Sequence, residues 1–156
     1  ETPVALGLAA LNGAGTMTLS SADALLSVGS GSFTGRIEGA GALTKTGSGT
    51  LLLSGSNSFS GPVSVELGTL QLDGGAALAD TARISVAAPA QLTLLAGESV
   101  AQLSGSGRVQ LDNGSRIALG SDGSDSRFDG VIAGSGSLAK QGSGTLILTG
   151  ANSYTG

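Results

Sequence analysis

The sequence has almost none of the residues that usually build catalytic sites and bulky cores. It has no cysteine, no histidine and no tryptophan, and only one tyrosine and three phenylalanines among 156 residues. Without histidine and cysteine, a Ser-His-Asp triad and a cysteine nucleophile are both excluded. Because aromatic side chains normally supply much of a core, this core must be built from Leu, Val, Ile and Ala.

Charge is scarce as well. Charged residues make up 12% of the chain, the net charge is −4 and the isoelectric point is about 4.5. The seven basic residues are scattered, which argues against nucleic acid and against an anionic membrane surface as partners. No apolar run approaches the ~20 residues of a membrane-spanning helix. Glu1-Thr2-Pro3 lacks the basic and hydrophobic segments of a signal peptide, so we expect a piece of a longer precursor.

Glycine, in contrast, is abundant, with 28 of 156 residues against roughly 7% in average proteins. Glycine loses the most conformational freedom on folding, so such a chain either stays disordered or adopts a regular fold with many turns. Disordered chains are poor in apolar residues, whereas 40% of this chain is apolar. The composition therefore favours a regular all-β fold.

A long internal repeat organises the chain. Residues 31–61 align without a gap on residues 126–156, a shift of 95 residues, and 17 of the 31 positions are identical. A weaker match, 11–15 on 103–107, extends the similarity upstream at a shift of 92, which implies a short insertion, most plausibly in 121–125. We expect two copies, at approximately 9–72 and 101–156, within a single segment that spans 1–156.

Within each copy, short segments alternate apolar with small or polar residues, as in Val63-Ser64-Val65 and Leu70-Gln71-Leu72. Alternation with a period of two predicts half-buried strands, and the intervening Gly/Ser/Asp clusters predict turns. Strands this short favour a solenoid of stacked parallel coils over a sandwich. With ~20–25 residues per coil, the chain would make about six to eight coils. Only Ala76–Ala82 suggests a single turn of helix.

The block Leu43–Gly61, LTKTGSGTLLLSGSNSFSG, closely resembles the autotransporter-associated β-strand repeat. Val63-Ser64-Val65 would supply its following strand and Gly68-Thr69-Leu70 its closing element, and Leu138–Gly156 fits the same pattern. The positions that carry the resemblance are Lys45, Gly47, Gly49, Leu51, Leu53, Asn57 and Phe59 in the first copy, and Lys140, Gly142, Gly144, Leu146, Leu148, Asn152 and Tyr154 in the second.

This resemblance implies a right-handed parallel β-helix in the passenger region of a Gram-negative autotransporter, exported across the outer membrane and either secreted or held at the cell surface. A structural stalk that supports adhesion or virulence and helps passenger folding is the function it implies. The alternatives are a module whose loop 121–129 binds a host glycan or protein, and a β-helix enzyme acting on polysaccharide. The expected partners are adjacent coils of the same passenger, and exposed coil ends would let the segment self-associate.

No catalytic or cofactor-binding residue stands out. A Ser-Lys dyad at Lys45 or Lys140 competes with a solvated lysine at a coil corner, which is the preferred interpretation. Four carboxylates in a Gly/Ser-rich stretch are weak calcium candidates, namely Asp112, Asp122, Asp125 and Asp129. Their spacing matches neither an EF-hand nor a calcium-binding nonapeptide, so solvated loop carboxylates are the preferred interpretation.

The remaining motifs are interpreted as structural. The Gly47–Thr50 segment has neither the lysine nor the following helix of a phosphate-binding loop and is therefore interpreted as a turn. The asparagine at 57 and 152 is expected to adopt a left-handed conformation or to hydrogen-bond across coils. The aromatic positions of both copies, Phe33, Phe59, Phe128 and Tyr154, are interpreted as core or corner residues rather than as a carbohydrate platform.

Overall fold

The computed structural model describes residues 4–156, in which every regular element is a β-strand. The expectation about a signal peptide falls on Glu1-Thr2-Pro3, which lie outside the described residues. No helix that could cross a membrane occurs within residues 4–156. The strands are β1 (Ala5–Gly13), β2 (Thr16–Leu19), β3 (Leu25–Phe33), β4 (Arg36–Gly39), β5 (Ala42–Lys45), β6 (Thr50–Leu53), β7 (Val63–Val65), β8 (Thr69–Leu72), β9 (Arg83–Val86), β10 (Gln91–Leu94), β11 (Glu98–Val100), β12 (Gln102–Gly105), β13 (Arg108–Leu111), β14 (Arg116–Leu119), β15 (Ser126–Phe128), β16 (Val131–Gly134), β17 (Ser137–Lys140), β18 (Leu146–Leu148) and β19 (Ser153–Tyr154).

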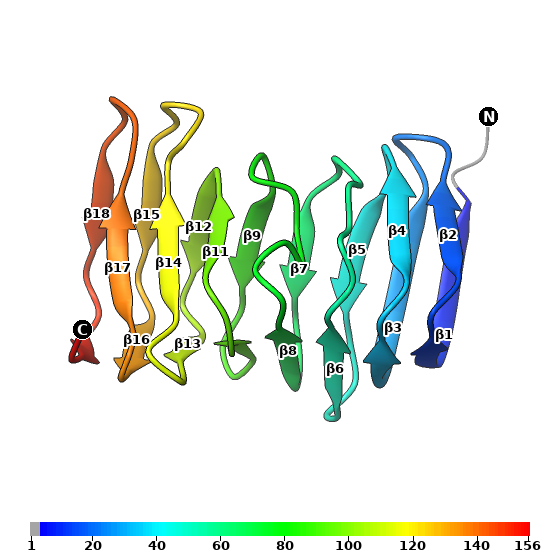
Figure 1. Cartoon of the computed structure of the whole chain (residues 1–156), viewed down its shortest axis with the longest axis horizontal. Helices are drawn as coiled ribbons and strands as arrows, with labels where there is room; N and C mark the ends of the chain where they lie inside the picture. The colour runs from blue at the N-terminus through cyan, green and yellow to red at the C-terminus, as the bar shows by residue number, and fades with distance from the viewer. Residues whose placement is uncertain (1–3) are drawn as a thin grey trace.

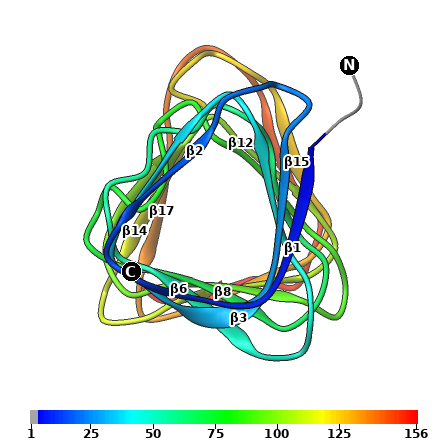
Figure 2. The same ribbon diagram turned by 90° about the vertical axis from the view of Figure 1, so that its right-hand side faces the viewer.

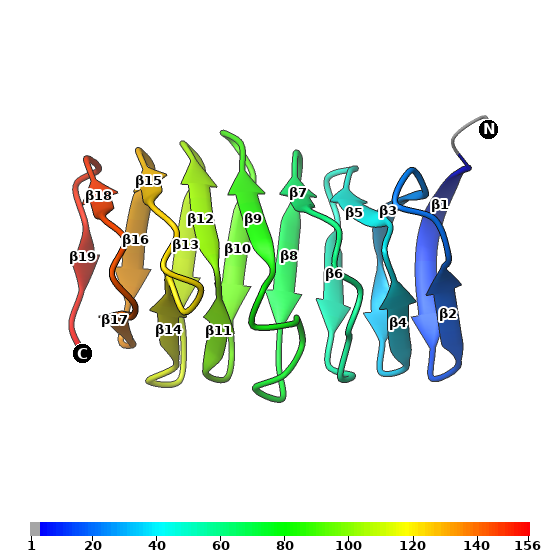
Figure 3. The same ribbon diagram turned by 90° about the horizontal axis from the view of Figure 1, so that it is seen from above.

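The chain winds into a β-solenoid of about 8 turns, with all of its strand pairs parallel. The coils stack along one axis from the N-terminal to the C-terminal end (Figures 1 and 3). Seen from the N-terminal end, the chain runs clockwise as it recedes, which makes the solenoid right-handed (Figure 2). The predicted parallel β-helix is confirmed. Paired residues of adjacent coils are spaced from 17 residues (Leu92 to Val109) to 23 residues (Gly105 to Phe128), so only some coils are shorter than the expected ~20–25 residues.

The cross-section is triangular, so the solenoid has three faces (Figure 2). The first face carries the starts of β1 and β3 and then β5, β7, β9, β12, β15 and β18. The second carries the ends of β1 and β3 and then β6, β8, β10, β13, β16 and β19. Because β1 and β3 bend around the corner, these two faces form one continuous hydrogen-bonded sheet. The third face holds β2 and β4 and, further along, β11, β14 and β17.

Aliphatic side chains fill the interior in columns that run along the rod. One column runs Leu26, Leu43, Val63, Ile84 and Leu103 through five successive paired strands, and each of these side chains is buried. Burying an aliphatic side chain stabilises the fold by about 1.5–3 kcal/mol. Because each column continues from coil to coil, each coil depends on its neighbours for burial.

The third face is interrupted between β4 and β11, where segments 55–60 and 75–80 follow the coil without forming strands. The helical turn predicted for Ala76–Ala82 is therefore wrong. Only one local bond, from the Ala82 amide to the Ala79 carbonyl at 2.8 Å, closes this segment on itself. Ala77 and Leu78 point into the core instead, and their backbone amides bind a side chain of the next coil.

The two sequence copies lie on different faces. β5 and β6 occupy the first and second faces, whereas β17 and β18, at the same positions of the second copy, occupy the third and first. A shift of 95 residues is not a whole number of coils, so the second copy is turned by one face. The same turn sequence therefore folds at two different corners, between the first and second faces and between the third and first faces.

Candidate functional site

Lys45 lies at the corner between β5 and β6, and its side chain turns inward. The residue is 0% exposed. Its Nζ donates hydrogen bonds to the carbonyls of Thr46 at 2.5 Å, Gly47 at 2.8 Å and Leu67 at 3.0 Å. The first two carbonyls belong to its own corner and the third to the next coil. The ammonium group therefore ties one corner to the corner of the following coil.

The interpretation of this lysine as solvated is wrong for Lys45. Burial lowers the pKa of its ammonium group, because removal from water penalises the charged form. The three carbonyl acceptors compensate by using all three of its donors. Among the described residues 4–156, the hydrogen-bond acceptors of Lys45 Nζ are backbone carbonyls and not hydroxyls, so the geometry gives no support to a Ser-Lys dyad.

Lys140 repeats this arrangement in the second copy, with one difference. Its Nζ donates to the carbonyls of Gln141 and Gly142, which correspond to those of Thr46 and Gly47. Within residues 4–156, Nζ has no third acceptor that would correspond to Leu67, and the side chain is exposed. The repeated lysine thus binds its own turn in both copies, and in the first copy it also binds the next coil.

Asn57 joins three successive coils on the third face. Its Oδ1 accepts a hydrogen bond from the Ile37 amide at 2.7 Å, and its Nδ2 donates to the carbonyls of Ala77 at 2.7 Å and Gly55 at 3.1 Å. Ile37 lies one coil before Asn57, and Ala77 lies one coil after it. The Asn57 side chain therefore takes the place of backbone hydrogen bonds where the third face has no strand. Of the two roles expected for this asparagine, hydrogen bonding across coils is the one observed.

Asn152, at the same position of the second copy, repeats the hydrogen bond that Asn57 makes to the previous coil. Its Oδ1 accepts a hydrogen bond from the Ile132 amide at 2.8 Å, as Asn57 accepts from Ile37. The following aromatic residue packs against the core in both copies, fully buried at Phe59 and partly buried at Tyr154. The asparagine therefore fixes the height of its own coil relative to the previous one.

The repeated glycines belong to the corners. Gly35 and Gly55 stack in successive coils, and a Cβ at Gly55 would collide with the carbonyl oxygens of Gly35 and Thr34. At the Lys45 corner, Gly47 has a φ of +66°, and Gly142 has +61° at the matching corner. Both angles lie in the left-handed region, which favours glycine. Gly47–Thr50 leads directly into β6, in agreement with its interpretation as a turn.

The comparison with known families recognises the residues just described. The model of the passenger-associated transport repeat matches residues 43–72 and 138–156, which contain Lys45, Asn57, Lys140 and Asn152. The chain carries autotransporter passenger repeats. No curated protein and no solved structure matches the chain significantly.

The passenger-repeat positions form one structural unit in each copy. Lys45, Gly47 and Gly49 build the corner, and Leu51 and Leu53 enter the core from the strand that follows it. The equivalent strand in the second copy presents Leu146 and Leu148, which are only partly buried. The passenger repeat thus specifies a strand, a lysine-filled corner and a second strand.

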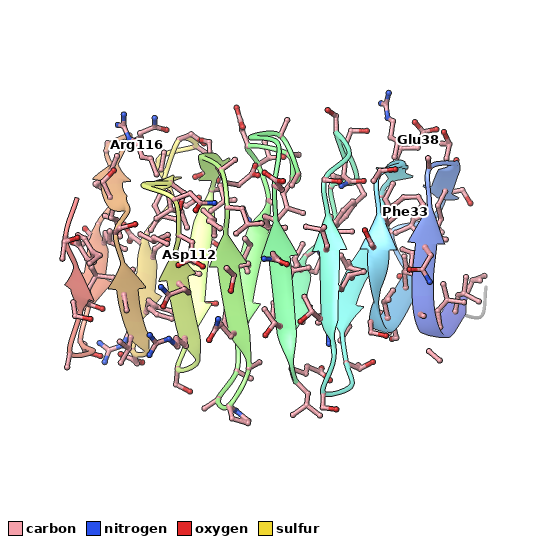
Figure 4. All side chains as sticks on the ribbon, turned by 60° about the horizontal axis from the view of Figure 1, so that its bottom comes forward. Phe33, Glu38, Asp112 and Arg116 are labelled. Carbon is pink, nitrogen blue, oxygen red and sulfur yellow. The ribbon has the colours of Figure 1, made fainter. Side chains whose placement is uncertain are left out.

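The four acidic candidates lie near the second passenger repeat but bind separate protein groups. Asp112 and Arg116 lie on either side of the corner between β13 and β14 (Figure 4), and Asp112 accepts a hydrogen bond from Gln110 at 2.8 Å. Asp125 accepts one from the Thr145 amide at 2.6 Å. No group of three or more carboxylates that could hold a metal ion occurs in the described part of the chain.

The other two candidates are exposed and hydrogen-bonded. Ser124 lowers the pKa of Asp122 by donating to its carboxylate from both its hydroxyl and its amide. Thr149 and Arg127 do the same for Asp129, with the Thr149 hydroxyl at 2.6 Å as the main contributor. These bonds hold loops in place, and they occupy oxygens that a calcium ion would need.

Glu98 is a buried acidic residue that the sequence analysis missed. It begins β11 on the third face and is 5% exposed. Its carboxylate accepts hydrogen bonds from the amides of Ala77 at 3.1 Å and Leu78 at 3.4 Å. Burial raises the pKa of Glu98 to about 7, and the charge of Asp80 adds to this. The alternation of Glu98-Ser99-Val100 was the available signal, since it places Glu98 on the same side as the buried Val100.

An open hollow of about 290 Å³ lies beside Glu98, between the interrupted part of the third face and β14. Glu98 supplies its one carboxylate and Arg116 its one guanidinium, and no aromatic side chain lines it. Polysaccharide-active sites generally combine paired carboxylates with aromatic walls. The hollow therefore gives no support to a glycan-cleaving site.

Proposed function

We propose that this segment is a structural stalk of an autotransporter passenger. The observation that carries the proposal is the use made of Lys45 and Asn57, the two most polar positions of the passenger repeat. All of their hydrogen bonds go to backbone groups of their own coil or of adjacent coils. Side chains committed in this way build a rod and are not available to a substrate.

Passenger repeats imply export, either to the cell surface or into the medium. We place the stalk outside the outer membrane, where it would hold other parts of the passenger away from the cell and so support adhesion or virulence. Folding one coil upon another suits such export, because each coil finds its hydrogen-bonding partners in the coil already formed. The corner lysines and the cross-coil asparagines would guide that stepwise folding.

Surface display tests the proposal. The chain is placed between an epitope tag and an outer-membrane export barrel, and antibody labelling of intact cells is measured. We expect strong labelling for the native chain and at least a several-fold loss for Leu51→Asp, which places a charge in the core, at equal amounts of inserted barrel. A matched control is Leu52→Asp, since Leu52 lies on the same strand but outside the core. Equal labelling of all three proteins would contradict a folded stalk as the exported form.

A second candidate function is binding through a surface loop. The corners after β14 and after β17 rise above their neighbours (Figure 1). The first of them, 120–125, is anchored by a bond from the Ser121 hydroxyl to the Asp80 carbonyl at 3.2 Å and by Arg83 at 4.0 Å from Asp122. An anchored, protruding loop on a repeat scaffold is a common place for recognition.

A glycan array and a host-protein pull-down separate the two functions. The native chain is compared with a variant in which 121–124 is replaced by Gly-Ser-Gly-Ser. Binding that is present only in the native chain would support recognition by the loop. Display without binding in either protein would leave the stalk as the function and exclude the loop.

A further inference from the structure

Asparagine occurs four times in the chain, and three of the four side chains do the same thing. The Oδ1 atoms of Asn12, Asn57 and Asn152 each accept a hydrogen bond from a backbone amide of an adjacent coil, at 2.9, 2.7 and 2.8 Å. Asn113, at the corner between β13 and β14, is the exception. It is exposed, and within residues 4–156 its carboxamide makes no such bond to another coil. Its side chain is therefore free to change rotamer.

Asn113 and Gly114 are the two central residues of a tight turn. Their φ angles are +55° and +69°, and the Ser115 amide closes the turn on the Asp112 carbonyl at 2.9 Å. Two successive positive φ angles are typical of a type I′ turn, for which Asn-Gly is the preferred sequence. Gly114 is exposed as well, and nothing lies within 4 Å of a Cβ built on it. The space around Gly114 leaves its peptide group room to turn.

An asparagine followed by glycine can react with its own backbone. The Gly114 amide nitrogen attacks Cγ of Asn113, so that a new C–N bond forms and the bond from Cγ to Nδ2 breaks. The side-chain nitrogen leaves as ammonia and takes up the proton that the amide nitrogen loses, and a succinimide ring remains. Water then opens the ring at either carbonyl, which yields aspartate or isoaspartate. Glycine favours the attack because it has no Cβ to shield its nitrogen.

We propose that Asn113 is a site of spontaneous deamidation, at which the exposed turn converts to aspartate and isoaspartate with water as the only co-reactant. Either product adds a negative charge beside Asp112. Isoaspartate also inserts a methylene group into the backbone of the turn, which moves the Ser115 amide relative to the Asp112 carbonyl. The modification therefore alters the corner between β13 and β14, and it does not depend on the stalk function.

The next coil opposes this reaction through one hydrogen bond. The Gly114 amide donates to the Ser135 hydroxyl at 3.2 Å, and this bond has to break before the nitrogen can turn toward Cγ of Asn113. Ser135 is itself exposed, so the bond exchanges readily with water and contributes little. Ser135→Ala should therefore increase the rate of deamidation at Asn113 without being required for it.

The pair Asn12-Gly13 has the same two residues but is held on both sides. The Oδ1 atom of Asn12 accepts from the Ser32 amide at 2.9 Å, and the Gly13 carbonyl accepts from the Thr34 amide at 2.8 Å. Both residues lie in β1, which pairs with β3 up to its last residue. The side chain and the peptide group would have to leave these partners before they could react. We therefore expect Asn12 to deamidate more slowly than Asn113 in the folded chain.

Peptide mapping by mass spectrometry during incubation in mildly alkaline buffer tests the proposal. Cleavage after arginine and lysine releases residues 109–116, with Asn113 as their only asparagine, and residues 1–36, with Asn12 as theirs. In the folded chain we expect 109–116 to deamidate several-fold faster than 1–36, to a mixture of aspartate and isoaspartate. The rate should rise with pH, because base removes the proton from the attacking nitrogen. In guanidinium chloride the two peptides should react at similar rates.

The controls are Ser135→Ala, which should react faster, and Asn113→Gln, whose longer side chain should leave 109–116 unmodified. Circular dichroism verifies that both variants are folded. The proposal is overturned if 109–116 reacts in guanidinium chloride but not in the folded chain, or if Asn12 reacts as fast as Asn113 in the folded chain. Aspartate as the sole product would equally overturn it, because direct hydrolysis would then replace ring formation. An unchanged rate in Ser135→Ala would overturn the role given to the bond from the next coil.

Discussion

Asn57 and Glu98 hold the same residue, Ala77, from opposite sides. The Asn57 amide donates to the Ala77 carbonyl at 2.7 Å, and the Glu98 carboxylate accepts from the Ala77 amide at 3.1 Å. Ala77 lies in the part of the third face that has no strand. Two side chains therefore supply the bonds that a backbone ladder supplies elsewhere, one from the coil before and one from the coil after. This dependence makes the third face sensitive to single substitutions.

Asn57→Ala should lower the free energy of unfolding by about 2–3 kcal/mol, because it leaves the Ile37 amide and the Ala77 carbonyl without partners in the interior. Urea denaturation measures the change. Asn12→Ala is the matched control, since Asn12 also accepts from the next coil, through the Ser32 amide at 2.9 Å, but does so in an exposed position. Asn12→Ala should lower the free energy of unfolding by no more than about 1 kcal/mol. Equal losses would show that burial of Asn57 is not what matters.

Lys45→Met and Lys140→Met compare the two copies of one repeat position. Methionine retains much of the aliphatic stem but removes all three bonds of Lys45. Because Lys45 is buried and bridges two coils, Lys45→Met should lower the free energy of unfolding by about 2 kcal/mol or more. Lys140→Met, at an exposed side chain, should lower it by less than about 1 kcal/mol. Chemical denaturation of both variants tests this, and a larger loss at Lys140 would contradict the bridging role of Lys45.

Glu98 should make stability depend on pH in an unusual direction. Burial raises its pKa from 4.5 to about 7 in the folded chain, so the fold prefers the protonated form. The stabilisation from proton binding is fully present below pH 4.5 and is lost as the pH rises to about 7. Each pKa unit corresponds to about 1.4 kcal/mol, so we expect a total change of about 3 kcal/mol.

The test is the free energy of unfolding between pH 4 and pH 8 for the native chain and Glu98→Gln. The native chain should lose stability relative to the variant as the pH rises, because glutamine does not titrate. Glu66→Gln, at an exposed carboxylate, is the control for a general effect of charge removal. A native–variant difference that stays constant across this range would contradict a raised pKa at Glu98.

Gly55→Ala should destabilise the corner by more than about 2 kcal/mol. The added Cβ would overlap the carbonyl oxygens of Gly35 and Thr34, and backbone atoms in a stacked coil cannot move aside independently. Gly7→Ala is the control, because nothing lies within 4 Å of a Cβ at Gly7. That change should be neutral or slightly stabilising. Thermal melting followed by circular dichroism distinguishes the two, and equal melting temperatures would contradict close stacking at Gly55.

The purified chain should give a strong β signal by far-UV circular dichroism and a cooperative thermal transition. Its core columns run through successive coils, so the inner coils have neighbours on both sides. The outer coils, with their exposed edges, should exchange amide hydrogens fastest. Hydrogen exchange by mass spectrometry measures this gradient. Uniform fast exchange with a coil-like spectrum would show that the segment needs further coils in order to fold.

Much of the fold could be predicted from local sequence. The alternation in Val63-Ser64-Val65 places its two valines inward, and both are buried. The Gly-Ser-Gly clusters form corners, where positive φ angles favour glycine. Predictions failed where the outcome depended on a neighbouring coil. Ala76–Ala82 has helical composition, but the bonds from Asn57 and Glu98 hold it along the third face.

The sequence by itself determined that this chain is a solenoid of short strands with a passenger repeat at two places, because period, turn chemistry and repeat are all local properties. Only the tertiary structure decided the phase of the coils, which is where along the sequence each coil passes from one face to the next. This phase sets the face that each copy occupies. The same phase decided that Lys45 lies beneath Leu67 and that Glu98 lies against Ala77. These outcomes depend on which residues stand one coil away, and coil lengths of 17 to 23 residues leave that spacing open until the coils have stacked.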